Sequence, residues 1–374
     1  MRASIVPAPI ASQPWAVIFP LVLLVCFGAA VLYSAAGGSF SQYAQSHLIR
    51  FAIFMAMALT MSYFSPQTAR SLAFPAYGGV LLLLMAVEAI GAIGGGSQRW
   101  LNLGPIVLQP SELMKPVIVL VLARYFHELP PGMVPTFRAM IPPAILIGFP
   151  VALVLLQPDL GTGLAITFGG VVVLFLAGIP IRWFAIGGAA AAVIAPLAYF
   201  FALHDYQRRR VTTFLDPESD PLGAGYHITQ SKIAIGSGGI FGKGFGNGSQ
   251  SHLDYLPEPH TDFVFATMSE EWGLVGGIFV LLVFGIVLRW GLGVARRAPD
   301  RFTSLLAAGM TATIFFYAAI NLMMVTGMAP VVGIPLPFMS HGGSSMMTNM
   351  ICVGTLMMVD RASRARRGSG GLSS

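Results

Sequence analysis

The stretch "WAVIFPLVLLVCFGAAVLYSAA", residues 15–36, decides the fold class of this chain. It holds no charged residue and is long enough to span a bilayer, which takes about 20 apolar residues. The apolar region of a cleaved signal peptide is shorter, and only one basic residue, Arg2, precedes this run. We therefore predict an uncleaved first transmembrane helix.

Comparable apolar runs recur along all 374 residues. Hydrophobic residues make up 55% of the chain and charged residues 10%, whereas about a quarter of the residues in a soluble domain are charged. We predict an all-α polytopic membrane protein, in which residues 1–374 form one transmembrane domain of about ten helices. The predicted spans are 14–36, 47–64, 71–93, 111–127, 139–156, 162–181, 183–203, 263–288, 302–329 and 342–359.

Loop charges predict the orientation of these helices. With a cytoplasmic N-terminus, 13 of the 21 Lys and Arg residues lie on the cytoplasmic side, as the positive-inside rule requires. Both termini are then cytoplasmic, and residues 204–262, between helices 7 and 8, form a large extracytoplasmic loop. Within it, "GYHITQSKIAIG", residues 225–236, is predicted to form a short amphipathic helix in the interface. The basic tail, residues 361–374, is predicted to be disordered and close to anionic lipid.

The formal charge of +6 does not indicate nucleic acid binding, since basic residues in a membrane chain mark cytoplasmic loops. Cys26 and Cys352 lie in apolar runs and indicate neither a disulfide nor a metal site. The seven histidines show no metal-ligand spacing, so the residues themselves predict no cofactor.

The unusual polar residues collect in four segments on the predicted outer face: 94–115, 157–163, 204–262 and 327–345. Ionisable side chains at membrane depth are costly and usually face a protein interior or a wet cavity. Their convergence predicts an outward-facing site within the helix bundle. The candidate residues are Arg99, Trp100, Glu112, Lys115, Asp159, Asp262, Ser340 and His341.

Asp262 also has a purely structural explanation. It precedes the helix predicted at 263–288, where a carboxylate complements the positive end of the helix dipole. Two further acids, Glu270 and Glu271, lie about 12 Å or more farther along that helix. We predict that they lie deeper in the membrane as helix-packing partners, too distant to share the chemistry of Asp262.

Other candidates have structural explanations as well. Glu112 and Lys115 are three residues apart and suit a mutually neutralising pair on one helix face. Asp159 suits a helix start, and Trp100 suits an anchor at the membrane interface. The arginine run 208–210 suits either a solvated loop or a clamp on lipid headgroups. The residues alone leave these alternatives open.

Long segments of the chain resemble one known family. They are "RWLNLGPIVLQPSELMK" at 99–115, "QPDLGT" at 157–162, "LPEPHTDFVFA" at 256–266, "EEWGLVG" at 270–276 and "GMAPVVGIPLPFMSHGGSS" at 327–345. The family is SEDS, for shape, elongation, division and sporulation. The likeness is greatest to its rod-elongation branch, and the first 90 residues add only the topology.

The resemblance implies a ten-helix peptidoglycan glycosyltransferase of the bacterial cytoplasmic (inner) membrane. Such an enzyme polymerises lipid II into a nascent glycan strand at the outer face. It works beside a class B penicillin-binding protein, a transpeptidase, and other proteins of the elongation complex. By this resemblance Asp262, in the HTDF motif, is the catalytic residue and Lys115 lies near it. We assign Asp262 as general base, with inversion at the donor sugar.

The residues that match the family's motifs, or that suit a diphosphate, form the predicted substrate site. They are Lys115, Glu112, Arg99, Trp100, Asp159, Arg208, Arg210, His260, Thr261, Ser340, Gly342 and Gly343. One position departs from the family, because His341 stands where a Tyr is usual, and a histidine titrates near neutral pH. A divalent cation, Mg²⁺ or Mn²⁺, suits the diphosphate, but no carboxylate cluster specifies one.

A lipid II flippase is the alternative function. Ten helices with intramembrane charges and interrupted segments also suit a transporter, and hydropathy does not separate the two. The polar residues collect on one face, the inner connections are plain and the outer loop is elaborate. These features favour the enzyme.

Overall fold

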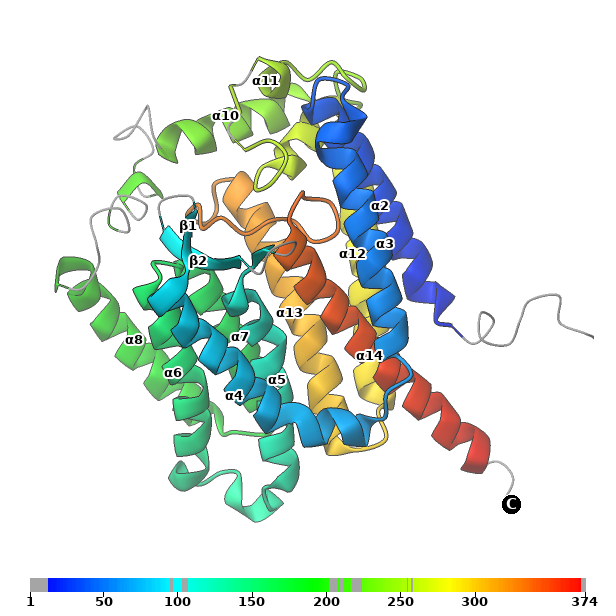
Figure 1. The fold of residues 1–374 in the computed structure, drawn as a ribbon. Coiled ribbons are helices and arrows are strands. Elements are labelled where there is room, and N and C mark those ends of the chain that lie inside the picture. Colours follow the sequence, from blue (N-terminus) through cyan, green and yellow to red (C-terminus); the bar gives the residue numbers. More distant parts are fainter. Residues whose placement is uncertain are drawn as a thin grey trace, which may run out of the picture.

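The computed structural model describes residues 13–94, 97–102, 107–201, 208, 212–214, 216, 224–253, 255–256 and 258–370. In this part of the chain, ten helices of at least 16 residues follow the ten predicted spans in order (Figure 1). They are α2 (Trp15–Ala35), α3 (Gln45–Met61), α4 (Pro66–Ile90), α5 (Pro110–Glu128), α6 (Ile141–Leu156), α7 (Leu160–Leu176), α8 (Ile181–Phe201), α12 (Val264–Arg297), α13 (Arg301–Val325) and α14 (Gly343–Gly370). Seven segments are long and apolar enough to cross a membrane, which confirms a polytopic all-α fold.

Shorter elements fill the connections. They are the π-helix η1 (Phe40–Ala44), the 3₁₀ turns η2 (Pro131–Met133) and η3 (Phe137–Met140), the helices α10 (Ala224–Ser237) and α11 (Ser249–His252), and the strands β1 (Ala92–Gly94), β2 (Ser97–Asn102) and β3 (Val107–Leu108). The strands form an antiparallel sheet in the order β1-β2-β3 between α4 and α5. This small sheet was not predicted, and it carries Arg99 and Trp100 on its central strand.

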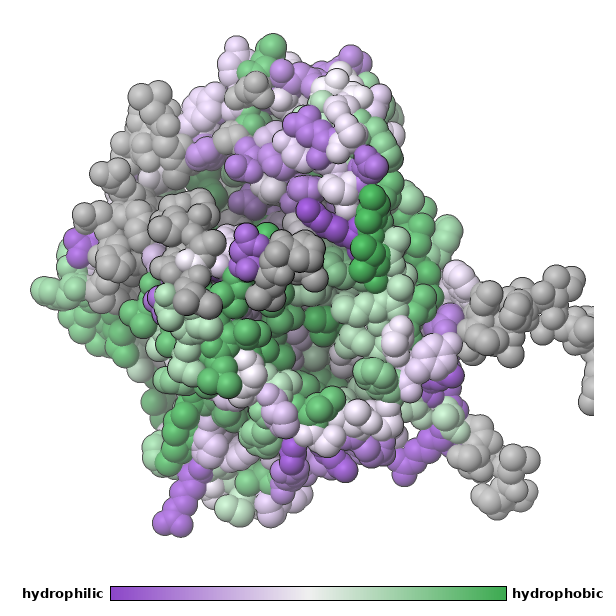
Figure 2. Space-filling view, viewed as in Figure 1, coloured by the Kyte–Doolittle hydropathy of each residue, from purple (hydrophilic) through white to green (hydrophobic). Residues whose placement is uncertain are grey.

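The surface has the polarity of a membrane protein. Figure 2 shows a largely hydrophobic middle between two more hydrophilic ends. Large apolar side chains such as Phe19, Leu82, Ile145 and Phe201 are exposed, each by 60% or more of its area. A soluble fold would bury such residues, whereas lipid accommodates them.

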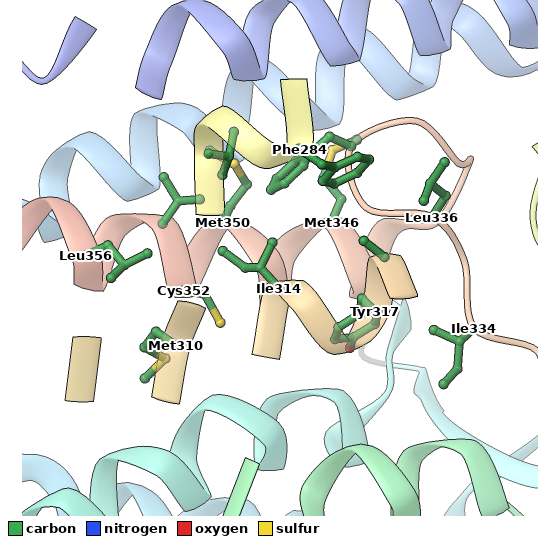
Figure 3. Close-up of a cluster of buried hydrophobic side chains, with 14 of the residues drawn as sticks. Phe284, Met310, Ile314, Tyr317, Ile334, Leu336, Met346, Met350, Cys352 and Leu356 are labelled. Carbon is green, nitrogen blue, oxygen red and sulfur yellow. The ribbon is translucent and has the colours of Figure 1, made fainter. Parts of the chain in front are cut away.

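Helix α13 lies at the centre of the bundle. It packs against α5, α7, α12 and α14, so that most of its residues are buried. Figure 3 shows part of this core, where Phe284 of α12, Ile314 and Tyr317 of α13, and Met350 of α14 gather. Tyr317 is the polar member of this group, and its hydroxyl points to the functional site described below.

The predicted helix at 263–288 is interrupted. Within α12, Gly273 has φ 61° and ψ −157°, a conformation that is essentially restricted to glycine. The break frees backbone groups, which the glycine-rich connection before α11 satisfies. The amides of Lys243 and Gly244 donate to the carbonyls of Glu270 (2.9 Å) and Glu271 (3.0 Å).

The interruption also changes the place of the two acids. Glu270 accepts hydrogen bonds from Lys243 Nζ (2.6 Å), Ser249 Oγ (3.0 Å) and the Gln250 amide (3.1 Å). Glu271 accepts one from Ser34. Both acids thus lie against the outer connection, and the predicted position deeper among the apolar helices is wrong. Their architectural role remains, since they fix that connection to the broken helix.

The C-terminal helix is longer than predicted. Helix α14 continues through Gly370, so the predicted disorder is wrong for residues 361–370, while 371–374 lie outside the described residues. The Arg361 guanidinium stacks over the ring of Tyr63 at 3.9 Å, and Arg364 pairs with Asp360 on the same helix. These contacts stabilise the additional turns.

The predicted amphipathic helix in the outer loop is present as α10. It lies at the outer end of the molecule, at the top of Figure 1, and packs on α12. Ser231 donates its hydroxyl proton to the Val325 carbonyl (2.7 Å), which fixes α10 to the end of α13. This contact ties the outer loop to the central helix.

We expect Gly273→Ala to destabilise the protein. A Cβ at this position would lie 2.4 Å from the Gly242 nitrogen, and the φ value alone costs an L-residue about 1–3 kcal/mol. The matched control is Gly285→Ala in the same helix, where no atom lies within 4 Å of the added methyl group. Thermal unfolding in detergent should show a lower Tm for Gly273→Ala only, and equal Tm values would contradict this account.

Candidate active site

A cavity of about 430 Å³ lies where the predicted outer segments meet. Its wall combines β2, the beginnings of α5 and α7, the turn before α12 and the connection from α13 to α14. The predicted residues that line it are Arg99, Trp100, Glu112, Asp159, Thr261, Asp262, His341, Gly342 and Gly343. The structure thus brings together residues that are far apart in the sequence.

Three consecutive backbone carbonyls, those of residues 260–262, are held by hydrogen bonds from one side of the cavity. The His341 amide donates to the carbonyl of residue 260 (2.9 Å), and the Ser340 hydroxyl donates to that of residue 261 (2.6 Å). The Asn321 side-chain amide donates to the carbonyl of residue 262 (2.9 Å). Buried carbonyls need such partners, because an unsatisfied one costs about 1–3 kcal/mol. These bonds fix the backbone that carries the candidate catalytic acid.

Asn321 was missed in the sequence. It is a fully buried polar residue within the apolar helix α13, and it also donates to the Ile334 carbonyl (2.7 Å). It thus joins the backbone of Asp262 to that of the neighbouring connection. The available signal was an amide in an otherwise apolar run, since such residues in membrane helices usually have a functional partner.

The carboxylate of Asp262 lies on the cavity wall beside a glycine. Gly333 has φ +72°, and a Cβ there would lie 3.5 Å from Asp262 Oδ2. The N-cap of α12 is Phe263, so Asp262 precedes the cap and is not the capping side chain itself. Its charge is still favoured by the nearby positive end of the helix dipole. The geometry is compatible with both the structural and the chemical explanation of this acid.

Glu112 and Lys115 form the predicted pair, with a third member. Lys115 Nζ donates to Glu112 Oε1 (2.6 Å) and to the Tyr317 hydroxyl (2.7 Å), and that hydroxyl donates to the other Glu112 oxygen. Glu112 lines the cavity, whereas Lys115 is 1% exposed and lies behind it. Loss of either Glu112 or Lys115 would leave the charge of the other buried and uncompensated, which is strongly destabilising.

Arg99 and Asp159 shape the opposite wall. Arg99 Nε donates to the Gln157 carbonyl (3.0 Å), and Arg99 also donates to the carbonyl of Pro158. Asp159 is the N-cap of α7 and accepts from the Thr162 amide (3.1 Å), which confirms the predicted helix start. Both side chains therefore hold the end of α6 against the start of α7 while lining the cavity.

The remaining predicted residues that the structure describes do not line the cavity. Ser340 is buried behind it, and the His260 ring stacks on Tyr43 with 4.1 Å between ring centroids. Arg208 donates to the Phe200 carbonyl (2.7 Å) at the end of α8. Arg210 lies outside the described residues.

The described residues contain no group of three or more His, Cys, Asp and Glu side chains that could hold a metal ion. In the cavity, Glu112 is already paired with Lys115, and Asp159 accepts from Gln109 Nε2 (3.0 Å). The side chains of the described residues therefore provide no preformed Mg²⁺ or Mn²⁺ centre.

The chain matches the FtsW/RodA/SpoVE family of cell cycle proteins over residues 14–365. It belongs to this family. It is 42% identical over 341 residues to the peptidoglycan glycosyltransferase MrdB of Escherichia coli K12, covering 91% of each chain. It is also 40% identical to the stage V sporulation protein E of Bacillus subtilis, over 76% of this chain and 77% of that protein. As a member of this family with several apolar spans, it is a multi-pass protein of the bacterial inner membrane.

Solved structures agree with this assignment to the FtsW/RodA/SpoVE family. The rod shape determining protein RodA of Thermus thermophilus matches with a TM-score of 0.70 at 29% identity, over 94% of this chain and 97% of that one. A chain from a peptidoglycan synthase complex that coordinates polymerization and crosslinking matches with a TM-score of 0.83 at 32% identity, over 94% and 98%.

His341 departs from the family pattern and lines the cavity. It lies beside Arg50, which was not predicted as a site residue. Its Nε2 lies 2.9 Å from Ser46 Oγ and 3.0 Å from Arg50 Nη1. Burial, followed by the charges of Arg50 and His260, lowers the pKa of His341 to about 4. The expected titration near neutral pH is therefore wrong, because the ring is neutral there. Burial also lowers the pKa of His260, against the opposing effect of Glu258.

This shift predicts a pH dependence of stability. Because the pKa of His341 is about 4 in the folded protein and 6.5 in the unfolded chain, the unfolded chain binds more protons between these values. Stability should therefore fall as the pH falls through that window. Between about pH 7.5 and pH 5, the Tm of the wild type in detergent should decrease more than that of His341→Gln. Parallel pH profiles of the two proteins would contradict the burial of this histidine.

Proposed function

We propose that this chain is a peptidoglycan glycosyltransferase that polymerises lipid II at the outer face of the inner membrane during cell elongation, with Asp262 as general base. The observation that carries this proposal is the carboxylate of Asp262 on a cavity wall, on backbone fixed by three hydrogen bonds, in a chain 42% identical to a named glycosyltransferase. The full-length match to RodA supports a role in elongation.

The reaction requires a base and a stabilised leaving group. The 4-hydroxyl of one disaccharide attacks the anomeric carbon of another, so that a C–O bond forms while the bond from that carbon to the lipid diphosphate breaks. The hydroxyl proton goes to Asp262, and the bonding electron pair leaves with the diphosphate. A positioned base contributes about 10²–10⁴-fold to such a step.

Direct displacement with inversion fits the other carboxylates of the cavity. A double displacement needs a second carboxylate as nucleophile. Glu112 is held by Lys115 and Tyr317, and Asp159 caps α7 while accepting from Gln109. Glu258, the third of these carboxylates, is solvent-exposed and accepts from Thr261 Oγ1 (3.1 Å). None of the three is arranged as a nucleophile, which supports a single step.

A class B penicillin-binding protein is the proposed partner. This chain resembles, over 94% of its own length, a chain of a peptidoglycan synthase complex in which polymerization and crosslinking are coordinated. A polymerase of this kind delivers uncrosslinked strands, so a transpeptidase must act on its product. The other elongation-complex proteins enter the proposal only through the family resemblance.

Asp262→Asn should lower lipid II polymerisation by about 10²–10⁴-fold, because the amide does not accept the hydroxyl proton. The measurement is glycan strand formation by the purified protein in detergent. Glu258→Gln is the matched control, since it neutralises a solvent-exposed carboxylate that lines the same cavity four residues earlier. We expect it to keep most of the activity, and an Asp262→Asn protein that polymerises at the wild-type rate would refute the base assignment.

The same assay separates the polymerase from a flippase. Detergent removes the two sides of the membrane, so a transporter has no gradient or leaflet to act on. Glycan strands would form only if the protein itself joins the sugars. A wild-type protein that moves lipid II across vesicles but forms no strands would favour the flippase.

Asn321→Ala should reduce kcat more than it raises KM. The side chain touches the backbone of Asp262, so its loss displaces the base without removing a contact to substrate. A displacement of the base by about 1 Å is enough to lower a rate by about 10²-fold. The control is Thr313→Ala in the same helix, whose hydroxyl bonds only to the Gly309 carbonyl (2.9 Å) among the described residues. Equal kinetics for the two variants would contradict a positioning role.

A further inference from the structure

One end of the cavity presents hydrogen-bond donors without acceptors. Helix α14 begins at Gly343, and its first turn closes with the bond from the Met346 amide to the Gly342 carbonyl (3.0 Å). The amides of residues 343–345 come before that bond, and so they have no acceptor within the helix. Residues 343–345, which carry these three N–H groups, line the cavity at the positive end of a long helix.

Two side chains beside these amides are also unused. Ser344 and Ser345 are each 8% exposed and line the cavity. Among the described residues, neither hydroxyl makes a hydrogen bond to the protein, and both residues border the cavity, where a ligand can reach them. A ligand that accepts hydrogen bonds would satisfy both hydroxyls.

Arg50 of α3 adds a positive charge at the same place. Its Nη1 lies 3.0 Å from the Nε2 atom of His341, a ring that is neutral at neutral pH. Among the described residues, no acidic side chain forms a salt bridge with it. The absence of a side chain at Gly343 leaves the guanidinium open to the start of α14, since a Cβ there would lie 3.6 Å from Arg50 Nε.

Three of the cations predicted for the diphosphate lie in the described part of the chain, and they are engaged elsewhere: Lys115, Arg99 and Arg208, which donates to the Phe200 carbonyl. Lys115 is buried behind the wall with Glu112 and Tyr317, and Arg99 donates to the carbonyls at the end of α6. Positive charge and unused donors therefore lie at the α14 end of the cavity. The carboxylates that line the cavity belong to other segments, the α5 and α7 starts and the turn before α12.

We infer that the first turn of α14, with Ser344, Ser345 and Arg50, binds the diphosphate of the lipid-linked donor sugar. This inference rests on the proposed function and names its leaving-group site. The amides, the hydroxyls and the guanidinium donate to the phosphate oxygens. As the anomeric C–O bond breaks, the electron pair moves onto the diphosphate, and the added negative charge develops beside these donors while the acceptor proton moves to Asp262.

Binding of farnesyl diphosphate to the purified protein in detergent tests this site directly. Arg50→Gln should weaken the Kd by about 10- to 100-fold, as expected for loss of a charged hydrogen-bond donor. Arg50→Lys should recover part of the affinity. The matched control is Arg70→Gln at the other end of the molecule, where Arg70 Nη1 likewise contacts a histidine nitrogen, that of His127, at 2.8 Å. We expect this control to bind as the wild type does.

Two further variants cover the case in which Arg50→Gln does not fold. Gly343→Ala places a methyl group at ordinary contact distance from Arg50 but over the first amides of α14, and the double variant Ser344→Ala, Ser345→Ala removes both hydroxyls. Each should raise the Kd for farnesyl diphosphate at least about threefold over the wild type. The Kd for farnesyl monophosphate should rise less. Wild-type binding by all of these variants would overturn the inference.

The failure of this site and the failure of the proposed function give different results. Asp262→Asn should bind farnesyl diphosphate at least as tightly as the wild type, because it removes a negative charge from the cavity wall and no donor to the anion. If the wild type polymerises lipid II and Arg50→Gln has unchanged kcat and Kd, the function stands and the site is refuted. If the wild type binds the diphosphate through Arg50 but forms no glycan, the site stands and the polymerase function is refuted.

Discussion

The position of Asp262, the proposed general base, depends on three hydrogen bonds to main-chain carbonyls. The backbone of residues 260–262 is irregular and lies at the end of a membrane helix, where water is scarce and unsatisfied carbonyls are costly. Asn321, Ser340 and the His341 amide satisfy these carbonyls from segments that lie about 60 to 80 residues later. Because the bonds involve the main chain, they hold the acid in place whatever its protonation state. The site therefore exists only when α13 and α14 are packed.

The same packing separates the charges of the cavity. Glu112 is compensated from behind by Lys115, so the wall near α5 presents a carboxylate whose charge is largely balanced. Arg50 lies beside His341 and Gly343, next to a neutral histidine instead of an acid. A substrate that carries a diphosphate at one end and a neutral sugar at the other is complementary to such a distribution. The cavity thus has a direction, which is a requirement for a polymerase that must distinguish donor from acceptor.

The sequence was sufficient for the ten helices and for the outer location of the site. Hydropathy fixes the spans, and the alternation of inner and outer connections then places the polar segments on one face. The break at Gly273 was not predictable, because the residues on both sides continue the helical pattern and glycine is compatible with helix and break alike. Asn321 and Arg50 were each one polar residue in an apolar run, and such a residue does not reveal its partner. The extension of α14 over 361–370 was missed because two of its stabilising contacts, Arg361 on Tyr63 and Arg366 on the Pro299 carbonyl, are tertiary, although the third, Arg364 with Asp360, lies within the helix.

Four helix N-termini border this cavity, those of α5, α7, α12 and α14, and the chain uses the last two differently. At α12 the protein supplies the negative charge itself through Asp262, which lies just before the first turn. At α14 it supplies small residues and leaves the amides open. Both dipoles favour an anion, and they act within the first turn of each helix. In the proposed reaction the first anion is neutralised by a proton while negative charge grows at the second. The total charge facing the two helices therefore changes little, so that less electrostatic reorganisation is needed during the transfer than at a site with one dipole.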